Sequence, residues 1–482
     1  MTAPPTPTPT SNSTSAGDLG QLTLHPDTGT IGEWGTWIAR YTCGALGLPA
    51  GSAIQVELPH TWNQWLRNSS RAVQANRPTE PFYVSARASR DGVRLRCEVE
   101  EERAGDARPN EDTEYVKRPR KGIDGTGRRY CWVVRVTLTE GSLEPADTID
   151  VVYGDRSGGS RGFTPPLWAA SPERVRAAVR VTREGSFEPL PEERRPLLHV
   201  RPAPPSEVAV VLPSVAAVGE PCDLIVAALD PNLNPSWPAG MRVTLRVVEG
   251  EAQLDGAARG DTTVTCPPNA WSARVRLTPR AAGLVRIRAQ SDDGRLFAVS
   301  NPCRVASAQP KERLFWGDLH GHTRFSWDAT GPAEDAFRYA REVSGLQIYG
   351  NADHGESLSA EDWQRIAQLN AEFYEPGRFA TLLGYENSQR FPFGHHNVFY
   401  RGGSGPLRHA NDAKLSEFIA GVLEERGGDV KDVLTIPHHM VALGNPSRPN
   451  TDWTLHDPRF HRVAEIYSGH GQSELSIEDS PL

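Results

Sequence analysis

The segment Trp316-Gly317-Asp318-Leu319-His320-Gly321-His322-Thr323 is an apolar run that ends in two histidines separated by a single glycine. Residues i and i+2 of an extended strand point to the same side, so His320 and His322 can present two imidazoles to one point. Of the 14 histidines in the chain, 11 lie at or beyond His320. The sequence therefore predicts a metal site in the last third of the chain.

Working outward from this segment, the hydrophobic pattern divides the 482 residues into four parts. Residues 1–19 are rich in Thr, Pro and Ser, which predicts a disordered tail. Apolar and polar residues alternate between turn clusters in residues 20–201 and again in 206–306, which predicts a β-rich domain followed by an immunoglobulin-like β-sandwich. In residues 311–482 strand-like runs alternate with amphipathic helical segments. We expect an α/β domain there, with a largely parallel sheet or barrel.

Composition excludes several classes of protein. The chain is 38% hydrophobic and 23% charged, as in globular proteins with sizeable cores. We find neither an apolar run that could span a membrane nor an export signal, so we expect a cytoplasmic protein with no membrane partner. Residues 311–482 carry 16 Lys and Arg against 25 Asp and Glu, a balance of −9. This acidic, histidine-rich part favours cations and argues against nucleic acid as a partner.

In the last part, groups that can bind metal lie next to one strand-like run after another. They are Asp318, His320, His322, Asp353, His354, Glu386, His395, His396, His438, His439 and His470. The carboxyl ends of successive parallel strands open into one shared mouth, so we expect these side chains to converge. Imidazoles and carboxylates without thiolates suit Zn, Mn or Fe, and a glutamate that bridges two ions would hold them about 3.5–4 Å apart.

The motifs GDLHGHT, ADHGE, GYE, GHHN, IPHH and EIYSGH resemble, in this order, those of the PHP (polymerase and histidinol phosphatase) superfamily and its DUF3604 branch, over residues 311–482. The resemblance implies a PHP-type distorted β/α barrel that holds two or three divalent metal ions and hydrolyses phosphoesters.

The resemblance also implies roles for individual residues. His320, His322 and His354 match metal ligands, Glu386 matches the bridging carboxylate, and Asp328 falls where many members have a further histidine. Either His395 or His396 matches the next ligand, and His438 the one after it; His439 takes the place of a proline, which leaves the choice between these two open. Asp318, Asp353 and His470 would lie behind the ligands or at the substrate and assist catalysis.

We therefore expect a phosphoesterase with a small-molecule phosphoester substrate. His320, His322, Glu386 and His438 would hold the ions, Asp328 and His354 would form a third position, and a metal-bound hydroxide would attack in line. Two alternatives stay open: an amidohydrolase-like enzyme that cleaves C–N or carboxylic ester bonds, and a non-catalytic β-rich scaffold with a degenerate metal domain. The sequence does not fix the metal, the substrate or the oligomeric state.

One part of the family pattern is missing. PHP sites are completed by a late AspxHis pair, and no such pair follows Glu465. An open parallel barrel would expose apolar edges, so we expect the native chain to continue past Leu482. Glu465 itself alternates within an apolar strand, and we interpret it as half of a buried structural pair, with a role as a ligand as the alternative.

Overall fold

The computed structural model describes residues 18–59, 62, 73–103, 130–256, 260–326, 329–388, 394–408, 415–426, 430–440, 451, 453–468, 471–474 and 479. Three predictions fall wholly or largely outside the described residues: the tail up to residue 17, and the site residues Asp328 and His470. In the part of the chain that is described, no helix is both long and apolar enough to cross a membrane.

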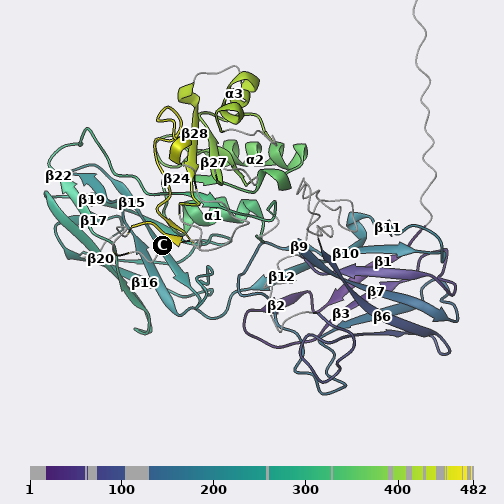
Figure 1. Ribbon diagram of the computed structural model, residues 1–482. Coiled ribbons are helices and arrows are strands. Elements are labelled where there is room, and N and C mark those ends of the chain that lie inside the picture. Colours follow the sequence, from purple (N-terminus) through teal and green to yellow (C-terminus); the bar gives the residue numbers. More distant parts are fainter. Residues whose placement is uncertain are drawn as a thin grey trace, which may run out of the picture.

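The N-terminal part consists of three sheets around a single hydrophobic core (Figure 1). The sheets have the strand orders β1-β3-β8-β5, β11-β10-β4-β7-β6 and β2-β12-β9. Side chains of β3 alternate between the core and the other face, as the period of two predicts. The elements are β1 (Gln21–His25), β2 (Thr28–Thr30), β3 (Trp37–Thr42), β4 (Ala53–Glu57), β5 (Val84–Ala88), β6 (Arg94–Arg103), β7 (Tyr130–Glu140), β8 (Thr148–Tyr153), β9 (Glu173–Arg174), β10 (Arg176–Arg180), β11 (Glu188–Pro189), η2 (Glu192–Arg194) and β12 (Leu197–Arg201).

The middle part is a β-sandwich with its own core, so the prediction of a second β-rich unit is confirmed. One sheet has the order β13-β15-β19-β17, and the other has the order β14-β22-β20-β16-β18 with β21 paired to β20. Its strands are β13 (Glu207–Val211), β14 (Val215–Ala217), β15 (Cys222–Leu229), β16 (Val243–Glu249), β17 (Ala252–Leu254), β18 (Asp261–Val264), β19 (Ala273–Pro279), β20 (Gly283–Ser291), β21 (Phe297–Val299) and β22 (Cys303–Ala306).

The C-terminal part combines short sheets with helices. Ser359 and Asp362 form the capping box that their spacing predicts, and α2 follows directly. The elements are β23 (Gly317–Gly321), α1 (Ala333–Glu342), β24 (Ile348–Asn351), η3 (Gly355–Ser357), α2 (Ala360–Phe373), β25 (Ala380–Thr381), β26 (Leu383–Asn387), β27 (His396–Tyr400), α3 (Leu415–Arg426), η4 (Val430–Asp432), β28 (Val433–Pro437), η5 (Trp453–Leu455), β29 (Tyr467–Ser468) and β30 (Gly471–Gln472).

The prediction of an α/β barrel for this part is wrong. Strands β23, β24 and β25 are parallel, but β26, β27 and β28 form a separate antiparallel sheet, and β29 pairs only with β30 among the described residues. Only residues 388–395 connect β26 to β27, and so short a connection joins antiparallel strands, whereas parallel strands need a longer crossover. Across the described residues strand is the predominant regular structure, and α1, α2 and α3 are the α-helices.

Helix α1 attaches the C-terminal part to both β-rich parts. Val343, at the end of α1, packs against Ala227 and Leu229 of the sandwich. At the other end of the helix, Asp335 accepts hydrogen bonds from the backbone and the hydroxyl of Ser171, at 2.7 and 2.6 Å. Figure 1 shows α1 beside the teal sandwich, with α2, α3, β24, β27 and β28 above it. Helix α1 therefore holds the C-terminal part, which carries the candidate site, against both β-rich parts.

Candidate metal centre

The parallel strands bring the first three predicted histidines toward Glu386. His320 lies in β23 and His322 directly after it, while His354 follows the neighbouring strand β24. His354 forms a parallel bridge with Glu386, the fourth residue of β26, and the Glu386 amide donates to the carbonyl of Asp353 at 3.0 Å. These backbone contacts place the residues after β23 and β24 at the end of β26.

The antiparallel sheet brings the remaining histidines to the same place. Because β27 runs opposite to β26 and β28, its first residue, His396, pairs with Asn387 near the end of β26 and with Pro437 at the end of β28. His395 precedes this pair and His438 follows it, and the His438 amide donates to the His395 carbonyl at 3.3 Å. The start of β27 therefore lies beside the ends of β26 and β28. The histidines converge at this edge of an antiparallel sheet, whereas in a barrel they would converge at the carboxyl ends of parallel strands.

Glu386 lies at the centre of the cluster. Its side chain is 2% exposed, and the surrounding imidazoles are those of His320, His322, His354, His395 and His438. Oε2 lies 3.0 Å from His322 Nε2, 3.6 Å from His320 Nε2 and 3.6 Å from His354 Nδ1. Oε1 lies 2.7 Å from His395 Nδ1 and 3.3 Å from His438 Nε2. The two carboxylate oxygens therefore face two different groups of histidines.

The charges of the cluster are strongly coupled. Burial opposes ionisation of Glu386, yet His354 and the hydrogen-bonding imidazoles around the carboxylate hold its pKa well below the usual range. Burial would also lower the pKa of His320, but hydrogen bonds with Glu386 and Glu465 outweigh it and raise the pKa to about 9. Burial lowers the pKa of His438, so that imidazole favours its neutral form.

Glu465, which the sequence predicted as half of a buried structural pair, does pair, with His320, but it is only partly buried. Its Oε2 lies 2.6 Å from Nδ1 of His320, and both side chains are partly exposed, at 22% and 24%. The Glu465 amide donates to the carbonyl of Pro437 at 3.0 Å, which ties this segment to the end of β28. A similar contact holds His354, whose Nδ1 lies 2.5 Å from Ser388 Oγ, and Ser388 in turn donates to Glu356 at 2.6 Å. The sequence signal for Glu465 was its position between apolar residues of a predicted strand.

The predicted residues Asp318 and Asp353 lie in different surroundings. Asp353 is fully buried, and its carboxylate accepts hydrogen bonds from the backbone of Thr323 at 2.6 Å and from the Thr323 hydroxyl at 3.0 and 3.1 Å. Burial raises the pKa of Asp353. Asp318 is exposed and accepts a hydrogen bond from the His320 amide at 2.9 Å. Both aspartates support the segment that carries His320 and His322.

The structure places the two adjacent histidines of the GHHN motif on opposite sides of β27. His395 contacts Glu386, whereas the buried ring of His396 lies 5.1 Å from the ring of His461. Burial lowers the pKa of His396 to about 3. The histidine brought into the Glu386 cluster is therefore His395.

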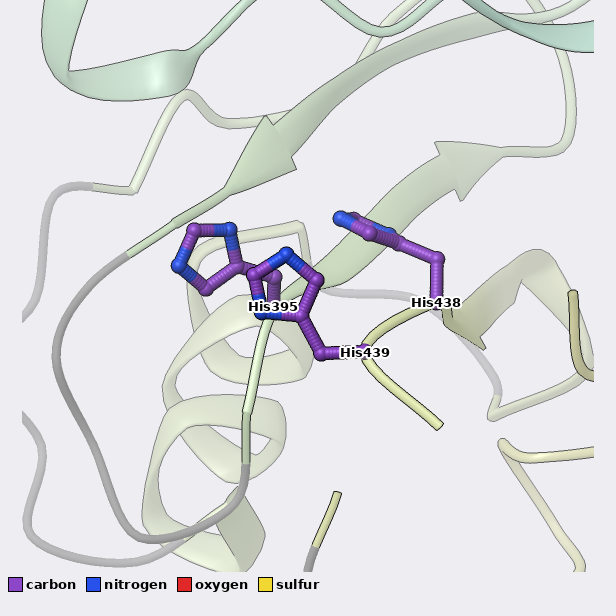
Figure 2. A group of neighbouring side chains, drawn as sticks. All are labelled: His395, His438 and His439. Atoms are coloured by element: carbon purple, nitrogen blue, oxygen red, sulfur yellow. The ribbon is translucent and has the colours of Figure 1, made fainter. Parts of the chain in front are cut away.

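His438 and His439 both lie within the cluster. The ring of His439 stacks on that of His395 with centroids 3.8 Å apart, and the ring of His438 lies 5.1 Å from that of His439 (Figure 2). The carbonyl of His439 accepts a hydrogen bond from the Thr451 amide at 2.8 Å, which anchors its backbone.

Three groups of described residues bring their ligand atoms within 4.8 Å of one another, so each could hold a metal ion. They are His320, His322 and Glu386; His320, His438 and Glu465; and His395, His438 and His439. The buried Nδ1 of His438 has no hydrogen-bond partner in the part of the chain that the structure describes. Imidazole and carboxylate donors with such an unsatisfied nitrogen fit a divalent metal ion of the Zn, Mn or Fe type.

Comparisons with known proteins agree with part of the sequence prediction. A family described as a protein of unknown function (DUF3604) matches residues 342–442, the segment that contains His354, Glu386, His395, His438 and His439. A protein of Chlamydia pneumoniae, described as uncharacterized, is 26% identical over 201 residues, which cover 40% of this chain and 30% of that protein. The chain therefore spans less than a third of this relative.

Similar solved structures have low sequence identity and low TM-scores. Domains 4 and 5 of the S-layer protein SbsC are 17% identical and cover 30% of this chain and 61% of their own, with a TM-score of 0.16. The D0-D1 domain of intimin is 9% identical and covers 59% of this chain and 96% of its own, with a TM-score of 0.17.

Proposed function

We propose that this protein is a metal-dependent hydrolase that acts on a phosphorus ester, with Glu386 bridging two divalent metal ions. The observation that carries the proposal is the position of the Glu386 carboxylate, whose Oε2 faces one group of histidines and whose Oε1 faces another. A buried carboxylate that bridges two ions in this way is typical of hydrolases in which the ions flank the reacting group.

The distances around Glu386 also suit ligands of a common ion. Donors that bind one ion tetrahedrally at about 2.1 Å lie about 3.4 Å apart. The separations from Glu386 to His322, His320 and His438 are 3.0, 3.6 and 3.3 Å. A single carboxylate carries too little negative charge to pair with five protonated imidazoles, and burial already favours the neutral, ligand-competent form of His438.

The residues of the chain would divide the work among them. His320, His322 and Glu386 would hold one ion, and Glu386 with His395 and His438 would hold the other. Bound divalent ions supply Lewis-acid activation of water and of the phosphoryl oxygens. Asp353 and Asp318 keep the segment of His320 and His322 in place, and Ser388 orients His354. A third ion position with Asp328 and His354 remains part of the proposal.

Two features support a phosphoester rather than an amide as the substrate. The motifs from GDLHGHT to EIYSGH resemble those of PHP phosphoesterases, and the DUF3604 match covers the middle of that series. Amidohydrolase-like sites that start from the same histidine pair add a lysine-type bridge. Of the three lysines at or beyond residue 311, Lys431 lies in η4 and Lys311 precedes β23, so neither follows a strand of the cluster.

Elemental analysis combined with a substrate panel tests the proposal. The purified protein should retain Zn, Mn or Fe in a constant ratio to the chain, and it should hydrolyse p-nitrophenyl phosphate or bis-p-nitrophenyl phosphate rather than p-nitroacetanilide. Glu386→Gln and His322→Ala should lose both metal and turnover, since each removes a donor from the ion positions.

His456→Ala is a matched control because His456 is an exposed histidine outside the cluster. It should keep the metal content and the rate of the wild type. A metal-free preparation that turns over the panel at an undiminished rate would overturn the proposal, and cleavage of the anilide alone would replace the substrate class.

A further inference from the structure

We infer that His439 adds a third imidazole to the ion position of His395 and His438, beside the Glu386 oxygen that the proposed function places there, and that this position selects Zn²⁺ over Mn²⁺. The inference deepens the proposed function and rests on it. Figure 2 shows the three rings gathered between the start of β27 and the end of β28. Their ligand nitrogens lie within 4.8 Å of one another, a span that small side-chain rotations reduce to the spacing of donors on one ion.

The position of His439 is fixed from both sides. Its side chain is 1% exposed, and its ring stacks on His395 at 3.8 Å with an interplanar angle of 23°. Its carbonyl accepts hydrogen bonds from the amide and the hydroxyl of Thr451, at 2.8 and 3.2 Å. A donor that is already held in place loses little conformational freedom when an ion binds.

The donor sets of the two ion positions differ in chemistry. The first position has the imidazoles of His320 and His322, whereas the second has those of His395, His438 and His439, and the Glu386 carboxylate is common to both, so the second position is richer in nitrogen donors. Imidazole donors suit Zn²⁺, Cu²⁺ and Ni²⁺, and carboxylate oxygens suit Mn²⁺. The position that contains His439 should therefore hold Zn²⁺ when Mn²⁺ is in excess, and the other position should exchange.

The test uses the full chain, first stripped of metal with a chelator. It is then dialysed against mixtures of Zn²⁺ and Mn²⁺ and its metal content is measured. The wild type should keep one tightly held Zn²⁺ in excess Mn²⁺. His439→Ala should lower the affinity for this Zn²⁺ by about tenfold or more, because the removal of an anchored group at a metal site lowers metal affinity at least this much. His439→Gln, which fills more of the same space, should behave in the same way.

Electron paramagnetic resonance of the protein loaded with Cu²⁺ reports the donors directly. Nitrogen hyperfine structure should correspond to three imidazoles in the wild type and to two in His439→Ala, while the control His456→Ala keeps the wild-type spectrum. Unchanged Zn²⁺ affinity and an unchanged nitrogen pattern in both His439 variants would overturn the inference. Because the readouts are affinity and spectrum, a protein that binds Zn²⁺ through His439 but hydrolyses no ester would fail only the proposed function.

Discussion

Oε2 of Glu465 lies 2.6 Å from Nδ1 of His320, although 145 residues separate the two in the sequence. A carboxylate that accepts the Nδ1 proton fixes the tautomer of the ring and leaves Nε2 free to face a metal ion. In His320 this second nitrogen points toward Glu386, at 3.6 Å from its Oε2. Glu465 therefore orients a proposed ligand from outside the segment in which the other ligands occur.

Glu465→Gln should lower metal affinity by about 10–100-fold, the usual effect of removing such a partner. The amide can still accept the Nδ1 proton, but it carries no charge to strengthen the bond. Competition between the protein and a chromophoric chelator measures the change. Glu474→Gln, which alters an exposed glutamate, is the control; equal affinities for both variants would show that Glu465 does not orient His320.

The stability of the metal-free protein should depend on pH through His320. Its pKa is about 9 in the folded state against an ordinary value of 6.5, so the protonated ring is stabilised by folding. A raised pKa gives stability that is fully present below about pH 6.5 and is lost as the pH rises toward about 9. Thermal unfolding in the presence of a chelator should therefore show a falling midpoint across this window.

Glu465→Gln provides the control for the pH effect, because it removes one of the two carboxylates that raise the pKa of His320. The fall in midpoint should be smaller in this variant than in the wild type. Identical profiles for the two proteins would assign the pH dependence to other groups.

The sequence located the cluster but could not choose between neighbouring histidines. Adjacent residues of a strand point to opposite faces, so only one of His395 and His396 can face Glu386. The choice is readable when one face is polar, but every residue of β27 is buried. Burial on both faces removes the alternation that would have distinguished them, and only the register of β27 against β26 and β28 decides it.

The sequence also could not predict which strands run parallel and which run antiparallel. Helices between strand-like runs predicted parallel strands, and this holds for β23, β24 and β25. Strands β27 and β28 are antiparallel although α3 lies between them. An intervening helix permits a parallel crossover but does not require one. The histidines converge even though the predicted strand direction was wrong, because the start of an antiparallel strand lies beside the ends of its neighbours.

Asp353 and Asp318 should differ sharply when replaced by alanine. Asp353→Ala leaves the buried amide and hydroxyl of Thr323 without their acceptor, which should cost about 1–3 kcal/mol of unfolding free energy. Asp318 is exposed, so water can satisfy the His320 amide in Asp318→Ala and the change should stay within about 0.5 kcal/mol. Denaturant unfolding of the two variants measures the difference, and similar losses would contradict it.

The contact of Val343, at the end of helix α1, should couple the unfolding of the C-terminal part to that of the sandwich. This side chain is 3% exposed and packs against Ala227 and Leu229 of β15. Val343→Ala removes two buried methyl groups, which should cost about 1–2 kcal/mol at about 0.8 kcal/mol for each group. Val343→Asp should cost more, because a carboxylate without a partner cannot stay buried in an apolar contact.

Calorimetry distinguishes loss of this contact from general destabilisation. If the contact couples the two parts, Val343→Asp should separate the unfolding of the C-terminal part from that of the sandwich and lower the temperature of the former. Val248→Asp is the matched control, because Val248 of β16 is 47% exposed and can carry a charge into water. A single transition at the wild-type temperature in Val343→Asp would mean that the polar contacts of α1 with the sandwich, such as that of Tyr339 with the Leu233 carbonyl, hold the two parts together without the apolar contact.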